Sequence, residues 1–393
     1  MPSKLRTPVA IVGAGPAGLM LSHLLARRGI DSIVVESRSR HEIETANRAG
    51  ILEAGSVRML IEEGVSDRVL ADGHEHRGIE LRFGGHGHRI DFHRLVGHSV
   101  WLYPQQDVFR DLADARERDG GDVRFEVSDV TVTDHVASPV LCFRDSDGSE
   151  VEVRADIVVG ADGSRSSCRE LVPQVQRREF FTTYPYAWLG ILADAPPSAP
   201  ELIYAHSDRG FALISQRTPT VQRMYLQCAV DEDLGDWSDD RIWDELAYRT
   251  AGDGFDLVTG TITDRAVLPF RSFVDETMRQ GRLVLAGDAA HVVPPTGAKG
   301  LNLALADVSV LSDVIDRALT AGDFELLDEY APAALERIWK AQSFSYWMTQ
   351  LLHLHGGADE FDARRQVGEL TSVVSSEQGM AYLAEAYTGW PAD

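Results

Sequence analysis

The sequence of 393 residues predicts an α/β fold: a Rossmann-like nucleotide-binding domain, an interleaved antiparallel-sheet domain and a helical C-terminal region. The first observation is a glycine-rich loop, Gly13–Gly18, which follows a short apolar strand and opens a helix. The second is an apolar strand, Ser32–Val35, which ends in Glu36 and completes a β–α–β–acid unit within about thirty residues. The third is a change near Tyr184, where strands rich in Tyr, Trp and Thr begin and continue to Leu268.

No linker-like stretch separates these parts, so we expect interleaved domains. The nucleotide-binding domain is expected to be discontinuous, with a substrate-binding antiparallel sheet inserted into it. The nucleotide-binding domain is predicted at 1–75, 98–182 and 269–325. The substrate-binding sheet is predicted at 76–97 and 183–268, and the C-terminal helical region at 326–393. The stretch 36–48 is predicted to be charged and irregular. Further strands are predicted at 8–12, 80–83, 88–92, 157–159 and 282–286, antiparallel strands at 123–132, 140–144 and 151–153, and helices at 108–118 and about 300–321.

The charge balance restricts the partners. Lys and Arg together number 38 and Asp and Glu 61, which gives a net charge of −23. Such a chain repels phosphate backbones and anionic lipid, so we expect neither nucleic acid nor membrane among its partners. An anionic substrate would therefore need its own local cation. The apolar run Val9–Ala26 is interrupted by glycine and proline, which argues against a membrane span.

Cysteine and histidine patterns do not predict a metal site. The three cysteines, Cys142, Cys168 and Cys228, lie far apart without a C-x-x-C pair, which predicts neither disulfides nor thiolate zinc and favours the reducing cytoplasm. Five histidines cluster at spacings that match no common ligand pattern. The cluster consists of His74, His76, His86, His88 and His93, and we expect a solvated loop for it, apart from His76, which is considered separately below.

The glycine loop predicts a dinucleotide site. Gly13 permits a tight turn, Gly15 lets the backbone approach a pyrophosphate, and Gly18 lets the helix pack on the sheet. The helix N-terminus adds free N–H groups and a positive dipole for the phosphates. Glu36, at the end of the next strand, is placed to accept hydrogen bonds from ribose hydroxyls.

Two further turns favour FAD over a nicotinamide nucleotide as the bound cofactor. Asp162 follows the buried strand 157–159, and Asp288 follows the strand 282–286. Three glycine–acid turns at strand ends are difficult to obtain by chance. The glycine-rich segment Pro294–Asn302 then opens a helix and brings N–H groups towards the isoalloxazine ring. Motifs of P-loop NTPases, zinc proteases and α/β-hydrolases are absent from the sequence.

Three segments carry a resemblance to a known family. RAGILEAG (Arg48–Gly55), ELIYAHSDRGFALISQR (Glu201–Arg217) and GDAAHVVPPTGAKGLN (Gly287–Asn302) resemble the class A FAD-dependent aromatic hydroxylases, in particular the 4-hydroxybenzoate 3-monooxygenases. The resemblance continues through RIWKAQSFSYWMT (Arg337–Thr349) to AEAYTGWP near the C-terminus. It implies hydroxylation of 4-hydroxybenzoate to 3,4-dihydroxybenzoate with NADH or NADPH and O₂, through a flavin C4a-hydroperoxide. It also implies a cytoplasmic homodimer.

The resemblance also implies roles for individual residues. Arg217 would bind the substrate carboxylate, aided by the hydroxyls of Ser215 and Tyr225. Tyr204 would bind the para hydroxyl, and Tyr387 and then His76 would carry its proton towards water. The remaining implied wall of the substrate site consists of Pro295, through its carbonyl, Thr296, Trp188, Leu202 and Leu213.

The nucleotide contacts follow in the same way. The implied FAD contacts are Gly13, Gly15, Gly18, Glu36, Arg48, Gln105, Asp162, Asp288, Gly300, Leu301 and Asn302, and the implied nicotinamide contacts are Arg38, Arg40 and Arg223. The chain departs from the family at Pro104, where a glycine is expected, and at Ala46, where an arginine is expected. Glu42 and Glu44 beside Ala46 would repel a 2′-phosphate, which predicts use of NADH or of both nucleotides.

Three alternatives stay open. A sister enzyme acting on 4-aminobenzoate or another para-substituted benzoate would have the same pocket residues. A flavin halogenase or simple flavin reductase is less well matched, because the W-x-W-x-I-P pattern is absent and a reductase would not need Arg217 and Tyr204. A non-catalytic flavin-binding protein is disfavoured by the presence of Asp288, Pro295 and Tyr387.

Overall fold

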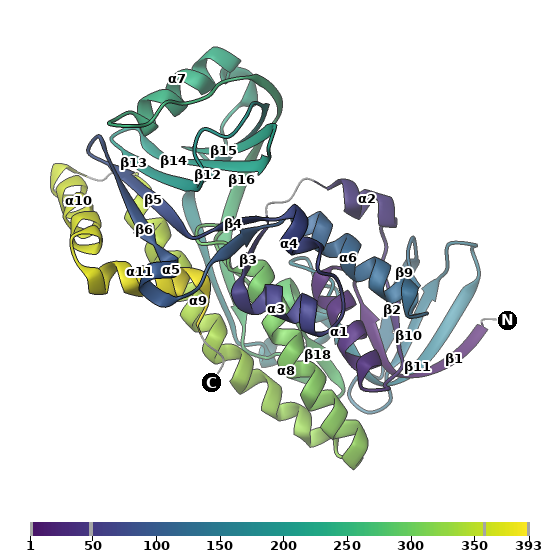
Figure 1. The fold of residues 1–393 in the computed structure, drawn as a ribbon. Coiled ribbons are helices and arrows are strands. Elements are labelled where there is room, and N and C mark those ends of the chain that lie inside the picture. Colours follow the sequence, from purple (N-terminus) through teal and green to yellow (C-terminus); the bar gives the residue numbers. More distant parts are fainter. Residues whose placement is uncertain (1–2, 47–49, 357–358, 391–393) are drawn as a thin grey trace.

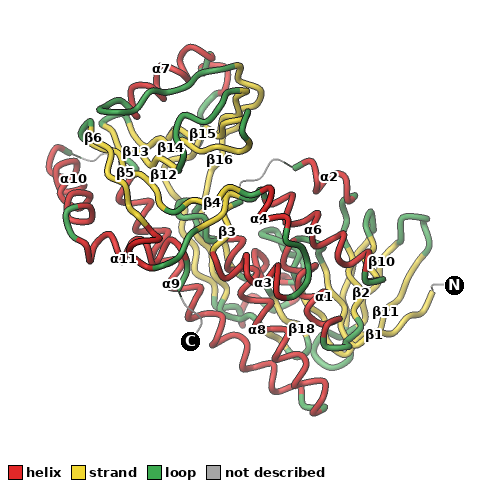
Figure 2. Tube along the Cα trace, viewed as in Figure 1, coloured by secondary structure: helices red, strands yellow, loops and turns green. Residues whose placement is uncertain are grey.

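The computed structural model describes residues 3–46, 50–356 and 359–390 (Figure 1). In these residues the strands form two sheets of eight strands and one of three. Figure 2 shows the two large sheets as separate groups of strands, with long helices running between and below them. No helix in the described ranges is both long and apolar enough to cross a membrane.

The first large sheet is mostly parallel and has the order β17-β18-β11-β1-β2-β8, with β10 paired to β11 and β9 to β10. Its central strands are buried on both faces, as expected for parallel strands covered by helices. Its bounds are β1 (Ser3–Val12), β2 (Ser32–Val35), β8 (Asp122–Arg124), β9 (Ser128–Thr133), β10 (Val140–Arg144), β11 (Glu150–Gly160), β17 (Arg279–Gln280) and β18 (Leu283–Leu285). The helix α1 (Pro16–Arg27) packs against α6 (Gln105–Arg118) and α8 (Gly300–Ala321).

The second large sheet is mostly antiparallel and has the order β19-β16-β12-β15-β14-β13-β5-β6. Its two faces belong to different cores because side chains alternate along a strand. Trp188 and Tyr204 lie on one face, which the C-terminal helices cover, whereas Ala187 and Ile203 lie on the other, which α7 (Asp239–Thr250) covers. The bounds are β5 (Gly78–Phe83), β6 (His86–Asp91), β12 (Glu179–Asp194), β13 (Leu202–Ser207), β14 (Gly210–Thr218), β15 (Val221–Cys228), β16 (Thr261–Asp275) and β19 (His291–Val292).

A small sheet and a set of helices connect these parts. The small sheet consists of β3 (Ile51–Glu53), β7 (Val100–Leu102) and β4 (His74–His76). The remaining helices are α2 (Arg40–Thr45), α3 (Ala54–Glu62), α4 (Arg68–Asp72), α5 (Phe92–Val96), α9 (Tyr330–Leu352), α10 (Glu360–Val374) and α11 (Glu377–Thr388). Figure 1 shows α10 and α11, in yellow, beside β5 and β6 of the second large sheet.

Several predicted elements need correction. The stretch 36–48, expected to be irregular, contains the helix α2, because Ser39 and Glu42 form a capping box. The strands predicted at 151–153 and 157–159 are one strand, β11, whose first half pairs with β10 and whose second half pairs with β18. The strand predicted at 123–132 is two: β8, which is parallel to β2, and β9.

The histidine cluster is also corrected. These histidines do not lie in one solvated loop. His74 and His76 belong to β4, His86 and His88 to β6, and His93 to α5. His76 is fully buried, since β4 pairs with β7 inside the protein. No group of side chains in the described ranges is arranged to hold a metal ion.

The glycine loop gives a stability prediction. An added Cβ on Gly18 would lie 1.9 Å from the Gly13 carbonyl oxygen, so backbone would have to move. Gly18→Ala is expected to lower the free energy of unfolding by about 1–3 kcal/mol, measured by urea denaturation. The matched control is Gly55→Ala in α3, where an added Cβ meets no atom within 4 Å. Equal stability of the two variants would contradict this account of the loop.

Candidate active site

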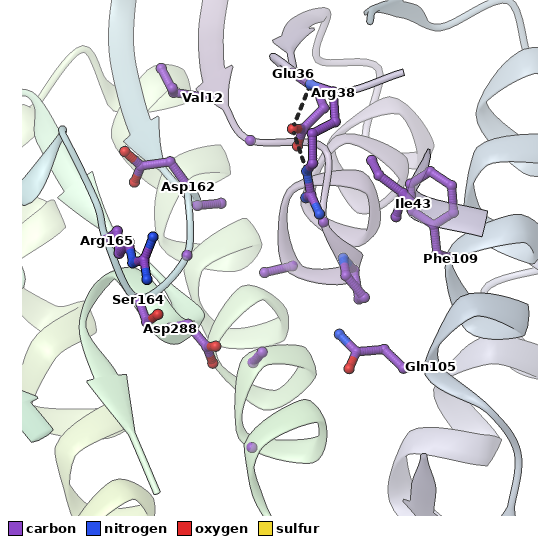
Figure 3. Close-up of a pocket in the computed structure, with 18 of the residues that line it drawn as sticks. Val12, Glu36, Arg38, Ile43, Gln105, Phe109, Asp162, Ser164, Arg165 and Asp288 are labelled. Atoms are coloured by element: carbon purple, nitrogen blue, oxygen red, sulfur yellow. Dashed lines mark hydrogen bonds and ion pairs between the residues drawn. The ribbon is translucent and has the colours of Figure 1, made fainter. Parts of the chain in front are cut away.

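A cavity of about 1160 Å³ lies at the carboxyl ends of the parallel strands. Its wall includes the last residue of β1, Val12, and residues one to three positions after β2, β11 and β18, namely Glu36, Asp162 and Asp288. Figure 3 shows Glu36 and Arg38 at one end of this cavity, with Asp288 and Gln105 on opposite sides further along. Crevices beyond the carboxyl ends of parallel strands are the usual ligand sites of such sheets.

The glycine loop borders this cavity with exposed backbone. Gly13 has φ +105°, and an added Cβ there would lie 2.3 Å from the Ala161 carbonyl oxygen. Gly15 caps α1 and has open space where its side chain would be. In the described structure no side chain caps the N-terminus of α1 or that of α8, and both helix starts line the cavity. The free amides and the open space at Gly15 fit the pyrophosphate of a dinucleotide such as FAD.

Glu36 is held by its own loop. One carboxylate oxygen accepts a hydrogen bond from Ala14 N at 3.1 Å, and the other accepts from Arg38 N and Arg38 Nε, each at 3.1 Å. The carboxylate therefore bridges the glycine loop and the segment after β2. It is buried, yet it lines the cavity, so its remaining lone pairs could accept hydrogen bonds from a ligand bound there.

The two predicted aspartates differ in what their carboxylates do. Asp162 accepts hydrogen bonds from Ser166 Oγ at 2.5 Å, Ser167 N at 2.7 Å and Cys168 N at 3.1 Å, so it mainly shapes its own turn. Asp288 lies in the short 3₁₀ turn after β18 and lines the cavity. That turn is held by Asp307 of α8, which accepts from Gly287 N at 2.9 Å. Asp307 also pairs with buried His291.

A second cavity, of about 210 Å³, adjoins the first and lies against the inner face of the antiparallel sheet. Twelve of the predicted residues line it: Gln105, Trp188, Leu202, Tyr204, Leu213, Ser215, Arg217, Arg223, Tyr225, Pro295, Gly300 and Leu301. Eight of them lie on β12, β13, β14 and β15, which are neighbours, and the alternation of side chains places these eight on one face. Among the predicted residues, Thr296, Tyr387 and His76 do not line it.

Arg217 supplies an unpaired cation to the small cavity. Its Nη1 is buried without a hydrogen-bond partner, and in the described ranges no carboxylate forms an ion pair with it. With the Gln106 amide turned so that its oxygen faces Arg217, Nη2 donates to that oxygen. Burial and the neighbouring Arg223 both lower the pKa of Arg217. An anion in the cavity would relieve both effects.

Tyr204 and Tyr387 form a buried pair of hydroxyls. Their oxygens lie 2.7 Å apart, although the residues are 183 positions apart in the chain. Burial raises the pKa of both groups above the ordinary tyrosine value. His76 is not hydrogen-bonded to Tyr387 in the described structure; its Nε2 lies 3.2 Å from the Gln216 amide nitrogen. Burial lowers the pKa of His76 to about 4, so its ring is neutral near pH 7.

The segment Pro294–Asn302 lies between the cavities. Pro295, Ala298, Gly300 and Leu301 line both cavities, as does Gln105. Asn302 lines neither, because its side chain is used inside the protein. Its oxygen accepts from Glu53 N and Ser56 Oγ, and its amide donates to two backbone carbonyls. Thr296 is buried, and its Oγ1 has no hydrogen-bond partner in the described structure.

Lys299, in the same segment, was not singled out from the sequence. Its ammonium is fully buried and donates to Glu53 Oε1 at 2.6 Å and to the Tyr387 carbonyl at 2.9 Å. Burial lowers the pKa of Lys299, and the Glu53 carboxylate opposes that shift. The position of Lys299 beside a glycine motif does not predict this role, because its partners come from distant parts of the chain.

The predicted nicotinamide residues are placed differently from one another. Arg38 pairs with Glu36, and Arg40 pairs with three carboxylates, those of Glu44, Asp114 and Glu117. Arg223 lines the small cavity, with its guanidinium 5.4 Å from the Tyr225 ring. Arg48 lies outside the described residues. Arg165, which the sequence did not indicate, is exposed at the wall of the large cavity.

Comparison with known proteins agrees with this geometry. Residues 6–345 match the model of the FAD binding domain family. The p-hydroxybenzoate hydroxylase of Acinetobacter baylyi is 43% identical over 98% of this chain and 96% of its own. The 6-methylpretetramide 4-monooxygenase of Streptomyces rimosus is 30% identical over 81% of this chain and 77% of its own.

A solved structure extends the comparison to the fold. The p-nitrophenol 4-monooxygenase of Pseudomonas putida superposes with a TM-score of 0.82, at 18% identity, over 99% of this chain and 100% of its own. The predicted fold class and the FAD cofactor are therefore confirmed. With a family model matched over most of its length and a relative 43% identical to it, the chain belongs to the class A FAD-dependent aromatic hydroxylases, which are monooxygenases.

Proposed function

We propose that this enzyme hydroxylates 4-hydroxybenzoate at position 3, giving 3,4-dihydroxybenzoate, with NADH or NADPH and O₂ as co-substrates. The observation that carries the proposal is that Arg217 and the hydroxyl of Tyr204 share one small cavity beside the FAD cavity. In the described ranges no carboxylate forms an ion pair with Arg217, and its Nη1 has no hydrogen-bond partner. These groups match the two ends of a hydroxybenzoate. The similarity to the p-hydroxybenzoate hydroxylase of Acinetobacter baylyi supports the same substrate.

The carboxylate end of the substrate is assigned to Arg217. A guanidinium can bind a carboxylate through two parallel hydrogen bonds, and Ser215 and Tyr225 hydroxyls line the same cavity. The protein has a net charge of −23, so a local cation is required to hold an anion there. Arg217 therefore fixes the orientation in which the substrate ring binds.

The hydroxyl end is assigned to Tyr204. The buried Tyr204–Tyr387 hydrogen bond gives a route by which the phenolic proton can leave the substrate, and loss of that proton makes the ring carbon at position 3 more nucleophilic. His76 is proposed to receive the proton beyond Tyr387. Its ring is neutral, and it would pass a proton on by accepting at Nε2, which faces the Gln216 amide, and releasing the proton of Nδ1, which has no hydrogen-bond partner in the described structure.

The other residues shape and dry the site. Trp188, Leu202 and Leu213 give apolar walls, and Pro295 and Thr296 lie in the segment between the cavities. Bound FAD would pass electrons from the nicotinamide to O₂ and deliver one oxygen atom to the substrate. We propose that Gly13, Gly15, Glu36, Asp288, Gly300 and Leu301 contact FAD, and that Gly18, Asp162 and Asn302 hold those backbone segments in place.

The division into domains and the assembly are also proposals. The predicted ranges are supported by the separate parallel and antiparallel sheets. A homodimer is supported by exposed aromatic side chains on β12 and α9, such as Phe181 and Tyr346, and light scattering of the purified protein would test it. The three unpaired cysteines of the described structure suit a cytoplasmic protein, which cell fractionation would test.

Arg217 gives the first prediction of function. Arg217→Ala is expected to weaken binding of 4-hydroxybenzoate by about 2–5 kcal/mol, because the substrate carboxylate would lose its cationic partner. The dissociation constant is measured by the absorbance change of bound FAD on titration. Arg154→Ala, at an exposed position of β11, is the matched control. An unchanged dissociation constant in Arg217→Ala would reject the assigned anchor.

Tyr204 gives the second prediction of function. Tyr204→Phe keeps the ring but removes the hydroxyl, so the variant is expected to oxidise NADH or NADPH and release mainly H₂O₂. Loss of positioned proton transfer typically costs about 10²–10⁴-fold in rate. The readout is the ratio of 3,4-dihydroxybenzoate formed to nicotinamide oxidised, with exposed Tyr382→Phe as the control. A wild-type ratio in Tyr204→Phe would remove Tyr204 from the mechanism.

The third prediction concerns the preference for NADH or NADPH. Arg38 and Arg40 are already paired with carboxylates, which leaves them poorly suited to a 2′-phosphate. We expect kcat/KM for NADH to equal or exceed that for NADPH. Ala46→Arg should shift the ratio towards NADPH by about tenfold, since a hydrogen bond to a charged group contributes about 1.5–3 kcal/mol. A strong NADPH preference in the wild-type enzyme would contradict this reading.

A further inference from the structure

Trp188 and a distant histidine form a buried contact behind the small cavity. The indole Nε1 of Trp188 lies 2.6 Å from Nε2 of His353, the C-cap residue directly after α9. Both side chains are buried, and His353 has no exposed surface. Trp188 lines the small cavity, whereas His353 does not. His353 therefore acts on the cavity wall from behind, through its contact with Trp188.

The donor and acceptor of this contact are fixed by chemistry. An indole N–H can only donate, so Nε2 of His353 must be the acceptor. The other ring nitrogen, Nδ1, lies 2.9 Å from the Thr349 carbonyl and must donate to it. Both bonds are satisfied only by the neutral ring with its proton on Nδ1. The planes of the two rings differ by 6°, so the indole and the imidazole are nearly parallel.

The histidine is itself held by stacked aromatic rings and at its backbone. Tyr186 stacks on its ring at 4.8 Å and Phe211 at 4.4 Å. The His353 carbonyl accepts from Gln366 Nε2 at 2.8 Å. The neighbouring Leu354 exchanges two hydrogen bonds with the Gln227 side chain of β15. These contacts fix the end of α9 against the sheet that carries Trp188.

We propose that His353 is a positioning residue for hydroxylation, which holds the Trp188 indole in one orientation and so fixes one wall of the substrate cavity. The proposal rests on the proposed function of that cavity. Tyr225, assigned to the substrate carboxylate, lies with its ring 4.8 Å from Trp188, so a displaced indole would disturb it as well. Without the acceptor, the buried indole N–H is left unpaired, which costs free energy. That cost favours rotation of the indole towards the cavity, or entry of a water molecule beside it.

The first test is spectroscopic and independent of turnover. In FAD-loaded enzyme labelled with ¹⁵N-tryptophan, the Trp188 indole N–H resonance, assigned with Trp188→Phe, should lie at low field. It should move upfield in His353→Phe, which keeps the aromatic stack, and stay near the wild-type position in His353→Gln, which restores an acceptor. His355→Phe, in the same segment, is the matched control. An unmoved resonance in His353→Phe would overturn the contact.

The second test is functional. In His353→Phe the dissociation constant for 4-hydroxybenzoate should rise by about three- to tenfold, as expected for one lost buried hydrogen bond. Product formed per nicotinamide oxidised should fall, while the maximal rate of nicotinamide oxidation stays close to wild type. His353→Gln should recover most of both losses. Wild-type affinity and coupling in His353→Phe, with the resonance moved, would overturn the positioning role.

Failure of the proposed function would be recognised separately. If the wild-type enzyme forms no 3,4-dihydroxybenzoate, the same variants are titrated with 4-aminobenzoate, and the affinity ratio between His353→Phe and His353→Gln is compared. Should His353→Phe not fold, ¹⁵N-histidine spectra of the wild-type holoenzyme decide the matter. The Nδ1–H tautomer of His353 at neutral pH is expected, and the Nε2–H tautomer would overturn the proposal.

Discussion

The buried ammonium of Lys299 joins three parts of the chain on which both cavities depend. It donates to Glu53 at the end of β3 and to the backbone carbonyl of Tyr387 in α11, while its own backbone lies between the cavities. Removing one member of a buried ion pair leaves an uncompensated charge, which is strongly destabilising. The position of Tyr387, and through it the Tyr204 hydroxyl bond, is therefore tied to the loop that borders the FAD cavity.

The same loop is shaped by its backbone. Ala298 has φ +54°, an uncommon value for a residue with a Cβ, and its carbonyl accepts from the Asn302 side chain. Asn302 also binds Glu53 N, so β3, the loop and α8 are joined by hydrogen bonds of one amide. Groups that must meet within a few ångströms are thus positioned by segments far apart in sequence. Preorganisation of this kind is what a hydroxylase needs to keep substrate close and water out.

Local features of the sequence were sufficient for the nucleotide-binding part. The glycine loop, the helix behind it and Glu36 are neighbours in the chain, so their spacing predicts their geometry. The capping box of α2 has a local signal as well, since Ser39 and Glu42 stand three residues apart. The continuity of β11 could not be predicted, because its two halves have different patterns. Polar and apolar residues alternate in the half that pairs with β10, whereas the half that pairs with β18 is fully buried.

The substrate cavity could not have been derived from spacing. Arg217 and Tyr204 were indicated by resemblance to a family, whereas their convergence depends on the order of strands in the second sheet. Lys299 and His353 gave no signal, because each is defined by partners more than eighty positions away. The four hydrogen bonds of the Asn302 amide, to Glu53, Ser56 and two backbone carbonyls, likewise gave no signal in the sequence.

The most direct test of this account is nicotinamide oxidation by the FAD-loaded enzyme with and without 4-hydroxybenzoate, with 3,4-dihydroxybenzoate and H₂O₂ quantified together. The account predicts oxidation that 4-hydroxybenzoate stimulates and that 3,4-dihydroxybenzoate matches mole for mole. Stimulated oxidation that yields only H₂O₂ would contradict the assignment of substrate. Oxidation that ignores 4-hydroxybenzoate would contradict the assignment of the cavity.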